Sequence, residues 1–242
     1  RKGLVSVCAT VALCAAWLAG CGGSEKFGEI AKSSPHLALP SNAKLVMEFQ
    51  PGIIAQNPIV NDLRALFGAE GRDLPFTGSI RMLGLDPQRQ IERSAWALYD
   101  IATMTWAMAL VGDLDEEAVL RGIESPVDPR LRAEVKAETY LGMAYHVVDR
   151  GGGAGGGSLC LIFPAPGVLL AASNAPLAQK AIAVWQGKAD GLGTDRAFKP
   201  LLEKASTASQ LWFAGFAQGT LSEMQITAGG LFSRGDNLGY GV

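Results

Sequence analysis

The sequence predicts an α+β domain, built mainly on an antiparallel sheet with helices packed on it. Two apolar runs, 94–101 and 103–113, stand back to back. Two more, 158–163 and 168–173, are joined by a Pro-Ala-Pro-Gly turn, which is typical of a β-hairpin. Segments with apolar residues at helical spacing lie among these strands. We therefore expect one sheet of hairpin-connected strands that is covered by helices.

The first elements are predicted to be a strand, a helix and two long strands. Residues 44–49 ("KLVMEF") have strand composition, and the following "QPG" ends the strand. Asn57 and Pro58 place an N-cap before a first-turn proline, and apolar residues at helical spacing continue as far as Gly68. Both faces of 103–113 are apolar, which predicts a central strand covered on both sides.

The acidic stretch after this strand predicts the start of a helix. Asp113 and Glu116 have the spacing of a capping box. With Asp115 and Glu117 they could be imagined as a calcium site, but they lack the alternating ligand spacing and the turn glycine of a calcium loop. The helix dipole favours acidic residues at this position without a metal. We therefore expect a helix cap here and no metal site.

The remaining elements alternate between strand and helix. Residues 140–149 are expected to form a strand. Asn174 begins a helix with an apolar stripe. Thr194 is expected to begin another helix, in which Pro200 sits late enough to cause a kink. Residues 210–216 return to strand.

Composition restricts the possible partners. A chain of 242 residues can bury a large core without a metal or a disulfide. Its net charge is -2, and 18% of its residues are charged, against a usual ~25%. No cluster of Lys and Arg offers a surface for nucleic acid or for anionic lipid headgroups. We therefore expect no nucleic-acid partner.

The N-terminus has the order of a signal peptide. Residues 4–19 carry no charge and follow Arg1 and Lys2. A transmembrane helix is the alternative, but spanning needs ~20 apolar residues, and this run is shorter and rich in alanine. Residues 1–20 are therefore expected to be a signal peptide. Because the sequence starts at an arginine rather than at Met, its true start is expected to lie upstream.

The end of this segment, Leu18-Ala19-Gly20-Cys21, resembles the lipobox of bacterial lipoproteins. The resemblance implies a diacylglyceryl group on the Cys21 thiol, cleavage between Gly20 and Cys21, and acylation of the new amino terminus. Two acyl chains hold a protein at a bilayer, at ~0.8 kcal/mol per buried CH₂, where one chain binds only marginally. The residue after Cys21 is Gly22, whereas an Asp at this position would resemble an inner-membrane retention signal. An outer-membrane protein that faces the periplasm is therefore expected.

The cysteines offer no other chemistry. Cys8 and Cys14 lie in the apolar N-terminal run, Cys21 closes it, and Cys160 stands alone in the rest of the chain. No pair remains for a structural disulfide, and no spacing fits a zinc or iron–sulfur site. Cys160 lies in the apolar "SLCLIF" and is expected to be a buried thiol rather than a reactive one. We expect no metal and no cofactor.

Four segments are predicted. After the signal peptide, residues 21–43 are rich in Gly, Ser and Pro and are expected to be the lipidated cysteine and a flexible tether, with His36 in solvent. Residues 44–208 form the α+β domain. Residues 209–242 repeat the order of strand, break and helix with which that domain begins. They are expected to start a second, similar half, cut off at Val242.

Three motifs resemble catalytic or cofactor-binding motifs of known enzymes, but the surrounding sequence does not fit those enzymes. The glycines of 151–157 include Gly-x-Gly-x-x-Gly, but a strand follows them rather than a phosphate-binding helix, so we expect a mobile connection. Ser41 and Lys44 have the spacing of penicillin-recognising enzymes but precede a strand. His146 lies beside an apolar face and is expected to be a half-buried strand residue. With His36 as the other histidine, a Ser-His-Asp relay is not expected.

These observations favour a non-enzymatic, membrane-anchored envelope lipoprotein that binds or scaffolds an envelope protein. Two alternatives stay open. A carrier of an apolar ligand or lipid would use tryptophans that otherwise pack in the core, and an envelope hydrolase would need carboxylate pairs that the sequence alone does not reveal. The tryptophans beyond the predicted signal peptide are Trp96, Trp106, Trp185 and Trp212. Element order and the phrases "LPSNAKLVMEF" and "VLLAASNAPLAQKAI" also resemble large exported bacterial proteins of uncharacterised function, which implies no catalytic residue.

Overall fold

The structure is a computed structural model and describes residues 27–54, 80, 83–100, 102–126, 132–149, 158–204, 211–215 and 238–241. In chain order its strands are β1 (Leu45–Phe49), β2 (Ile91–Asp100), β3 (Thr105–Gly112), β4 (Glu134–Tyr140), β5 (Met143–Asp149), β6 (Leu159–Ala165), β7 (Val168–Ala172), β8 (Leu211–Gly215) and β9 (Leu238–Gly241). The helices are residues 27–33, the 3-10 helix η1 (Pro35–Ala38), α2 (Pro51–Ile54), α5 (Glu116–Glu124), α6 (Ala175–Trp185) and α7 (Lys199–Lys204).

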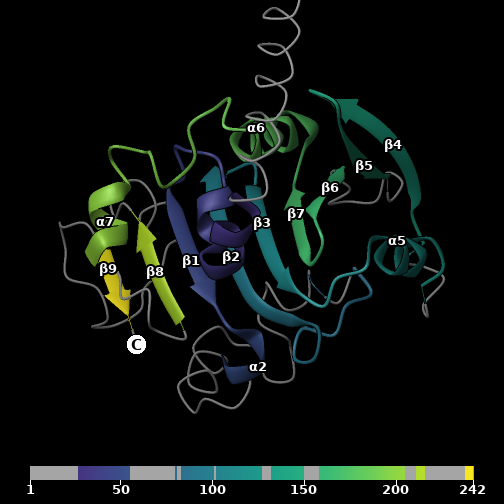
Figure 1. Ribbon diagram of the computed structural model, residues 1–242, viewed down its shortest axis with the longest axis horizontal. Coiled ribbons are helices and arrows are strands. Elements are labelled where there is room, and N and C mark those ends of the chain that lie inside the picture. Colours follow the sequence, from purple (N-terminus) through teal and green to yellow (C-terminus); the bar gives the residue numbers. More distant parts are fainter. Residues whose placement is uncertain are drawn as a thin grey trace, which may run out of the picture.

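The nine described strands form one sheet in the order β4-β5-β6-β7-β3-β2-β1-β8-β9 (Figure 1). Every neighbouring pair in this sheet is antiparallel. Helices pack on the sheet, so the predicted α+β class is confirmed. The strands β4 and β9 lie at the two ends of the sheet, far from each other.

The central strand is β3, as the sequence predicts. It pairs with β2 on one side and with β7 on the other. Ala107 and Ala109 face a first core, and Met108 and Leu110 face a second core on the opposite side of the sheet. All four side chains are buried, so β3 is covered on both faces.

The first core lies beneath α6, η1 and residues 27–33. The helix α6 packs on β3, β5, β6 and β7, while η1 packs on β1, β2 and β3 (Figure 1). Asn174 caps α6 as predicted, because its Oδ1 accepts a hydrogen bond from the Leu177 N–H at 2.9 Å. The predicted apolar stripe of this helix is buried in the first core and consists of Leu177, Ala178, Ala181, Ile182 and Trp185.

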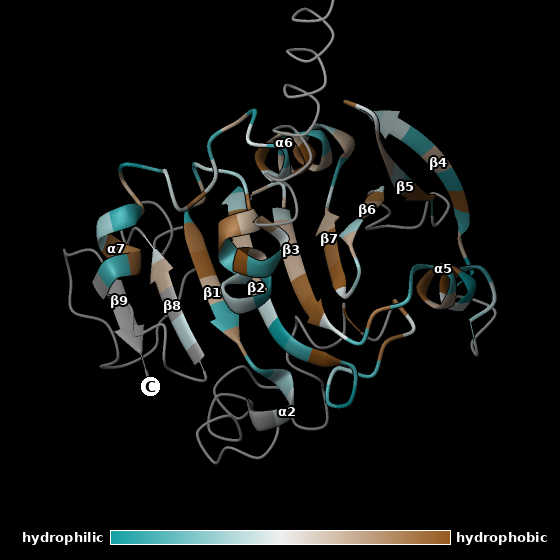
Figure 2. Cartoon of the chain, in the orientation of Figure 1, coloured by the Kyte–Doolittle hydropathy of each residue, from teal (hydrophilic) through white to brown (hydrophobic). Residues whose placement is uncertain are grey.

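The second core lies beneath α5 and the segment around Leu83. Val119 and Ile123 of α5 pack there with Leu83 and Leu85. Hydropathy follows this two-sided burial, because β3 and β7 are mainly hydrophobic while β4, at the end of the sheet, is largely hydrophilic (Figure 2).

Residues 27–43 fold, so the predicted flexible tether of 21–43 is wrong over this range. Residues 27–33 are helical, and Ala31, Ala38 and Leu39 are completely buried in the first core. Pro40 forms a β-bridge with Gly191. The content of Gly, Ser and Pro suggested a linker, but the interspersed apolar residues have enough surface to bury.

The strand predicted over 140–149 is divided by a turn. Leu141 and Gly142 both have positive φ, 52° and 81°, and connect β4 to β5 as a two-residue hairpin loop. Leucine is uncommon in this backbone conformation, so the sequence did not signal the turn. The Gln186 amide donates to the Leu141 carbonyl at 3.2 Å and ties the turn to the end of α6.

Two helices start later than predicted. The cap of α5 is Asp115 rather than Asp113, since the Asp115 Oδ1 accepts from the Ala118 N–H at 2.7 Å. The Asp113 N–H instead donates to the Gln90 carbonyl at 2.9 Å. Likewise α7 begins at Lys199 rather than at Thr194.

Pro200 is therefore the second residue of α7 rather than a late, kinking one. At the first turn of a helix, proline interrupts no backbone hydrogen bond, so it is compatible with a straight helix.

The beginning of the predicted second half joins the same sheet. The strand β8 pairs with β1, and β9 pairs with β8. The existence of a second half stays a prediction. The helix expected after Asn57 and the glycines of 151–157 lie outside the described residues, although the flanking β5 and β6 pair directly.

Candidate functional site

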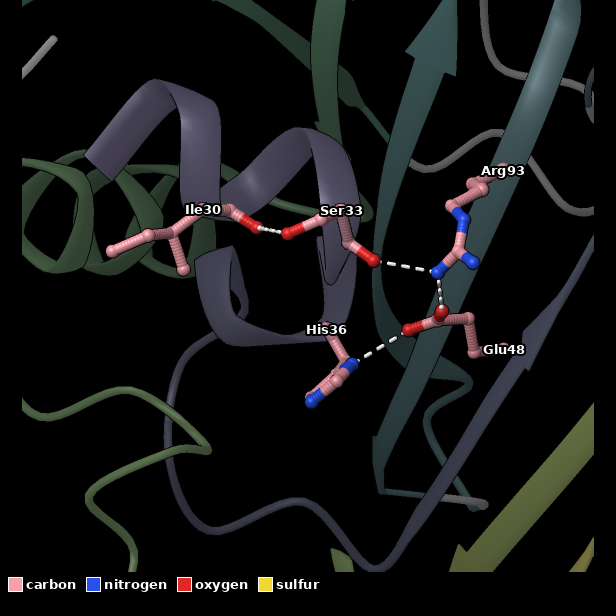
Figure 3. Close-up of polar contacts among 5 residues, drawn as sticks. All are labelled: Ile30, Ser33, His36, Glu48 and Arg93. Atoms are coloured by element: carbon pink, nitrogen blue, oxygen red, sulfur yellow. Dashed lines mark hydrogen bonds and ion pairs between the residues drawn. The ribbon is translucent and has the colours of Figure 1, made fainter. Parts of the chain in front are cut away.

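A buried charge cluster connects the N-terminal segment to the sheet (Figure 3). Glu48 of β1 lies between His36 of η1 and Arg93 of β2. The distance from His36 Nδ1 to Glu48 Oε2 is 2.6 Å, and Arg93 Nη1 donates to Glu48 Oε1 at 3.1 Å. The exposed fractions of the side chains are 5% for His36, 6% for Glu48 and 28% for Arg93. We call these three residues the N-terminal clamp.

Strand alternation places Glu48 on the face of the sheet that bears the first core. Val46, two residues earlier, lies in the first core, and Glu48 shares its face of β1. Its neighbours across the sheet are Ala95 on β2 and Trp212 on β8. The Trp212 ring meets the His36 ring edge-on, with centroids 5.1 Å apart, and thereby covers the clamp.

Arg93 also contacts the helical residues that precede η1. Its Nη1 donates to the Ser33 carbonyl at 2.5 Å, and the Ser33 hydroxyl donates to the Ile30 carbonyl at 2.9 Å (Figure 3). Carbonyls at the end of a helix carry partial negative charge, so a guanidinium is favourable there. Arg93 therefore holds both a carboxylate and a helix terminus.

The contact with Glu48 determines whether His36 Nδ1 donates or accepts a hydrogen bond. A carboxylate only accepts hydrogen bonds, so His36 Nδ1 donates to Glu48. The predicted position of His36 in solvent is wrong: the side chain is buried against Trp212. Burial of this pair keeps water away from the imidazole, so the arrangement suits a structural connection.

A second set of contacts attaches the chain just after η1. The Asn42 N–H donates to Asp195 Oδ2 at 2.7 Å, and the Tyr99 hydroxyl donates to the Pro40 carbonyl at 2.8 Å. Burial, with a further contribution from the Asp195 carboxylate, raises the pKa of Tyr99. The hydroxyl therefore stays protonated and remains a donor over the whole physiological range.

His146 is a half-buried strand residue, as predicted. Its side chain is 13% exposed, and its Nε2 lies 2.7 Å from Glu116 Oε1. The contact joins β5 to the first turn of α5. The Phe163 ring lies edge-on to the imidazole, with centroids 6.1 Å apart.

Cys160 is a buried free thiol, as predicted. Burial, with a smaller effect of the Glu138 carboxylate, raises its pKa to about 11, so the thiol is protonated and unreactive at neutral pH. Nearby, the Tyr145 hydroxyl donates to Glu138 across β4 and β5 and accepts from Gln179 at 3.4 Å. Donation to Glu138 is the main reason that the pKa of Tyr145 is raised.

The four tryptophans that follow the predicted signal peptide divide into two groups. Trp185 and Trp212 are buried in the first core, as the packing interpretation predicts. Trp96 and Trp106 stack on each other beside the second core, with centroids 5.1 Å apart and an angle of 18° between the rings. This second pair is only partly buried.

Gly20 and Cys21, the predicted cleavage and lipidation residues, lie outside the described residues. In the described parts of the chain, no three His, Cys, Asp or Glu side chains gather as a metal site would need. No helix that the structure describes has the length and apolar character to cross a bilayer. The N-terminal clamp was not predicted from the sequence. Its one signal was Glu48, an acid inside the apolar strand "LVMEF".

Comparisons with known proteins add little. No protein-family model and no curated protein matches the chain. Among solved structures, crystal form I of TP0453 gives a TM-score of 0.42 at 10% identity, over 75% of this chain and 62% of that one. Crystal form IV of TP0453 gives 0.46 at 15% identity, over 84% of this chain and 70% of that one. The chain thus spans less than two thirds of the first structure, and neither likeness supports a conclusion about function.

Breaking the N-terminal clamp should destabilise the protein strongly. We expect Glu48→Ala to lower the free energy of unfolding by about 3–5 kcal/mol, because it leaves the buried His36 without its acceptor and removes the carboxylate partner of the partly buried Arg93. Urea denaturation measures this change. In Glu48→Leu/His36→Phe, both members of the pair are replaced by apolar groups, and the loss should be smaller than the sum of the two single losses.

The matched control is Glu116→Ala, which breaks the more exposed pair with His146 and should cost about 1 kcal/mol or less. Equal costs for the two alanine variants would show that the clamp is not a special connection.

Asp195 should make stability depend on acid pH. Burial alone would raise the pKa of its carboxyl, but the N–H groups of Asn42, Ala197 and Phe198 outweigh burial and lower the pKa. The stabilisation is therefore present above the unfolded-state pKa of about 3.9 and is lost as the pH falls through the lower folded-state value.

We expect Asp195→Asn to be less stable than the wild type by about 1 kcal/mol at pH 7, with the two proteins converging below about pH 4 in urea denaturation. Asp190→Asn, an exposed neighbour, is the control. A difference that stays constant with pH would contradict this assignment.

Proposed function

We propose that the chain is a membrane-anchored envelope lipoprotein whose folded domain binds or scaffolds an envelope protein and performs no catalysis. The anchor is the lipobox-like Leu18-Ala19-Gly20-Cys21. The observation that supports the proposal best is the short distance along the chain from this anchor to folded structure. Phe27 already packs against Trp185, with ring centroids 5.3 Å apart.

This arrangement limits the distance between domain and bilayer. Between Cys21 and Phe27 the chain reaches at most about 20 Å when fully extended. An acylated Cys21 would therefore hold the first core close to the lipid headgroups. The N-terminal clamp connects the N-terminal segment to β1 and β2. The lipid anchor would therefore hold the sheet at the membrane, as a membrane scaffold requires.

The two histidine pairs support a binding role over a hydrolytic one. His36 joins η1 to β1, and His146 joins β5 to α5. Within the described residues, neither imidazole has a serine hydroxyl as its hydrogen-bond partner. Both pairs therefore act first as connections between elements.

The proposed location is the bacterial cell envelope, on the outer membrane and facing the periplasm. Gly22 supports this location, since an Asp there would resemble the inner-membrane retention signal. The proposed partners are the membrane itself, through the lipid, and an envelope protein.

Lipidation is tested by expressing the complete gene in a bacterium and measuring the intact mass. We expect cleavage before Cys21, an added mass of acyl chains, and recovery of the protein in the membrane fraction. Cys21→Ser should abolish all three.

Cys14→Ser is the matched control, because it changes a cysteine of the apolar run outside the lipobox. A wild-type protein that carries no acyl chains and retains residues 1–20 would refute the anchor.

A second candidate function is the binding of an apolar ligand or lipid. The stacked, partly buried Trp96 and Trp106 favour it, since such rings offer a flat apolar contact beside the second core.

The tryptophan pair should report such a ligand by fluorescence. We expect a brominated long-chain fatty acid to quench wild-type tryptophan emission, and Trp96→Phe/Trp106→Phe to lose more than about half of that quenching, because quenching requires contact with the emitting ring. Trp185→Phe, on the opposite face, should retain it. Quenching that is absent, or equal in all three proteins, would exclude the ligand at this pair.

A further inference from the structure

The strand β4 is an edge of the described sheet. The structure describes no strand beyond β4, and most of its residues are exposed on both faces. We propose that two copies of this chain associate by pairing their β4 strands antiparallel, centred on Ala137. This interaction goes beyond the proposed function and does not depend on lipidation.

The turn between β4 and β5 determines which backbone groups point outward. Leu141 and Gly142 form a hydrogen-bonded two-residue turn, so Tyr140 directs its N–H and C=O toward Met143 of β5. Bonding direction alternates along an antiparallel strand. The residues that direct their N–H and C=O to the free edge are therefore Val135, Ala137 and Thr139.

One register uses all three of these residues. If β4 pairs antiparallel with its copy about Ala137, then Ala137 lies opposite itself and Val135 lies opposite Thr139. Each of these pairs exchanges two hydrogen bonds. The register thus satisfies the outward N–H and C=O groups of both edges.

The same register complements charge. It places Lys136 opposite Glu138 of the second copy, twice, at positions where side chains approach most closely. Centring on Lys136 instead would place Lys136 opposite itself and Glu134 opposite Glu138, so that like charges would face each other. The present pair of Lys136 and Glu134, at 3.5 Å, is exposed on both sides, so its loss costs little.

Within the described residues, the β4 edge carries few of the features that usually block pairing. Exposed edges are commonly blocked by proline, by bulges or by short length. The strand β4 has seven residues, no proline and an unbroken register with β5. Lys136 would disfavour pairing with many other strands, but in this register it lies opposite Glu138 of the second copy.

Sedimentation of the full chain in detergent tests the association. We expect a concentration-dependent dimer. Ala137→Pro should weaken it at least about tenfold, because proline removes an outward N–H from each copy while leaving the bonds to β5.

Ala137→Val keeps the N–H and should preserve the dimer. A monomer at every concentration up to the solubility limit, or an equal dimer in Ala137→Pro, would overturn the proposal.

Cysteine cross-linking tests the register and does not require the proline variant to fold. Opposed Cα atoms in a hydrogen-bonded pair lie about 5.5 Å apart, within disulfide range. Mild oxidation should therefore link Ala137→Cys to its copy, identified as the 137–137 peptide by mass spectrometry. Thr139→Cys should not link, because its two copies lie about 13 Å apart. Cross-linking at 139 but not at 137 would refute the register.

Discussion

The buried carboxylate of Glu48 is the constraint on which the N-terminal half of the structure depends. A carboxylate in the first core is tolerated only with charged or hydrogen-bonding partners. Its two partners come from different elements, His36 from η1 and Arg93 from β2. The N-terminal segment must therefore fold onto the sheet for the charge to be compensated. Once it does, Ala38 and Leu39 complete the first core.

The sheet imposes the second constraint, because its middle strands must be apolar on both faces. In β3 and β7 the fully buried residues are alanine, valine, leucine and methionine, whereas charged residues lie mainly near strand ends and in β4. Among the buried strand residues that the structure describes, Glu48 is the one that carries a charge. That exception marks the place where a segment from outside the sheet is attached.

Local signals predicted most of the fold. The β6–β7 hairpin, the cap at Asn174 and the two-faced strand β3 each follow from residues close together in sequence. The turn at Leu141 was missed because its backbone conformation is unusual for leucine. The clamp was missed for a different reason: His36 and Glu48 meet only after η1 folds back over β1, and sequence spacing does not show that contact.

The position of the N-terminal segment on one face of the sheet has a consequence for symmetry. Antiparallel pairing of two identical edge strands in one continuous sheet generates a twofold axis normal to that sheet. Rotation about such an axis does not exchange the two faces of the sheet. Both N-terminal clamps would therefore lie on the same side of the joined sheet. If Cys21 is acylated as proposed, the two lipid anchors of such a dimer would enter a single leaflet, with the joined sheet lying parallel to the bilayer.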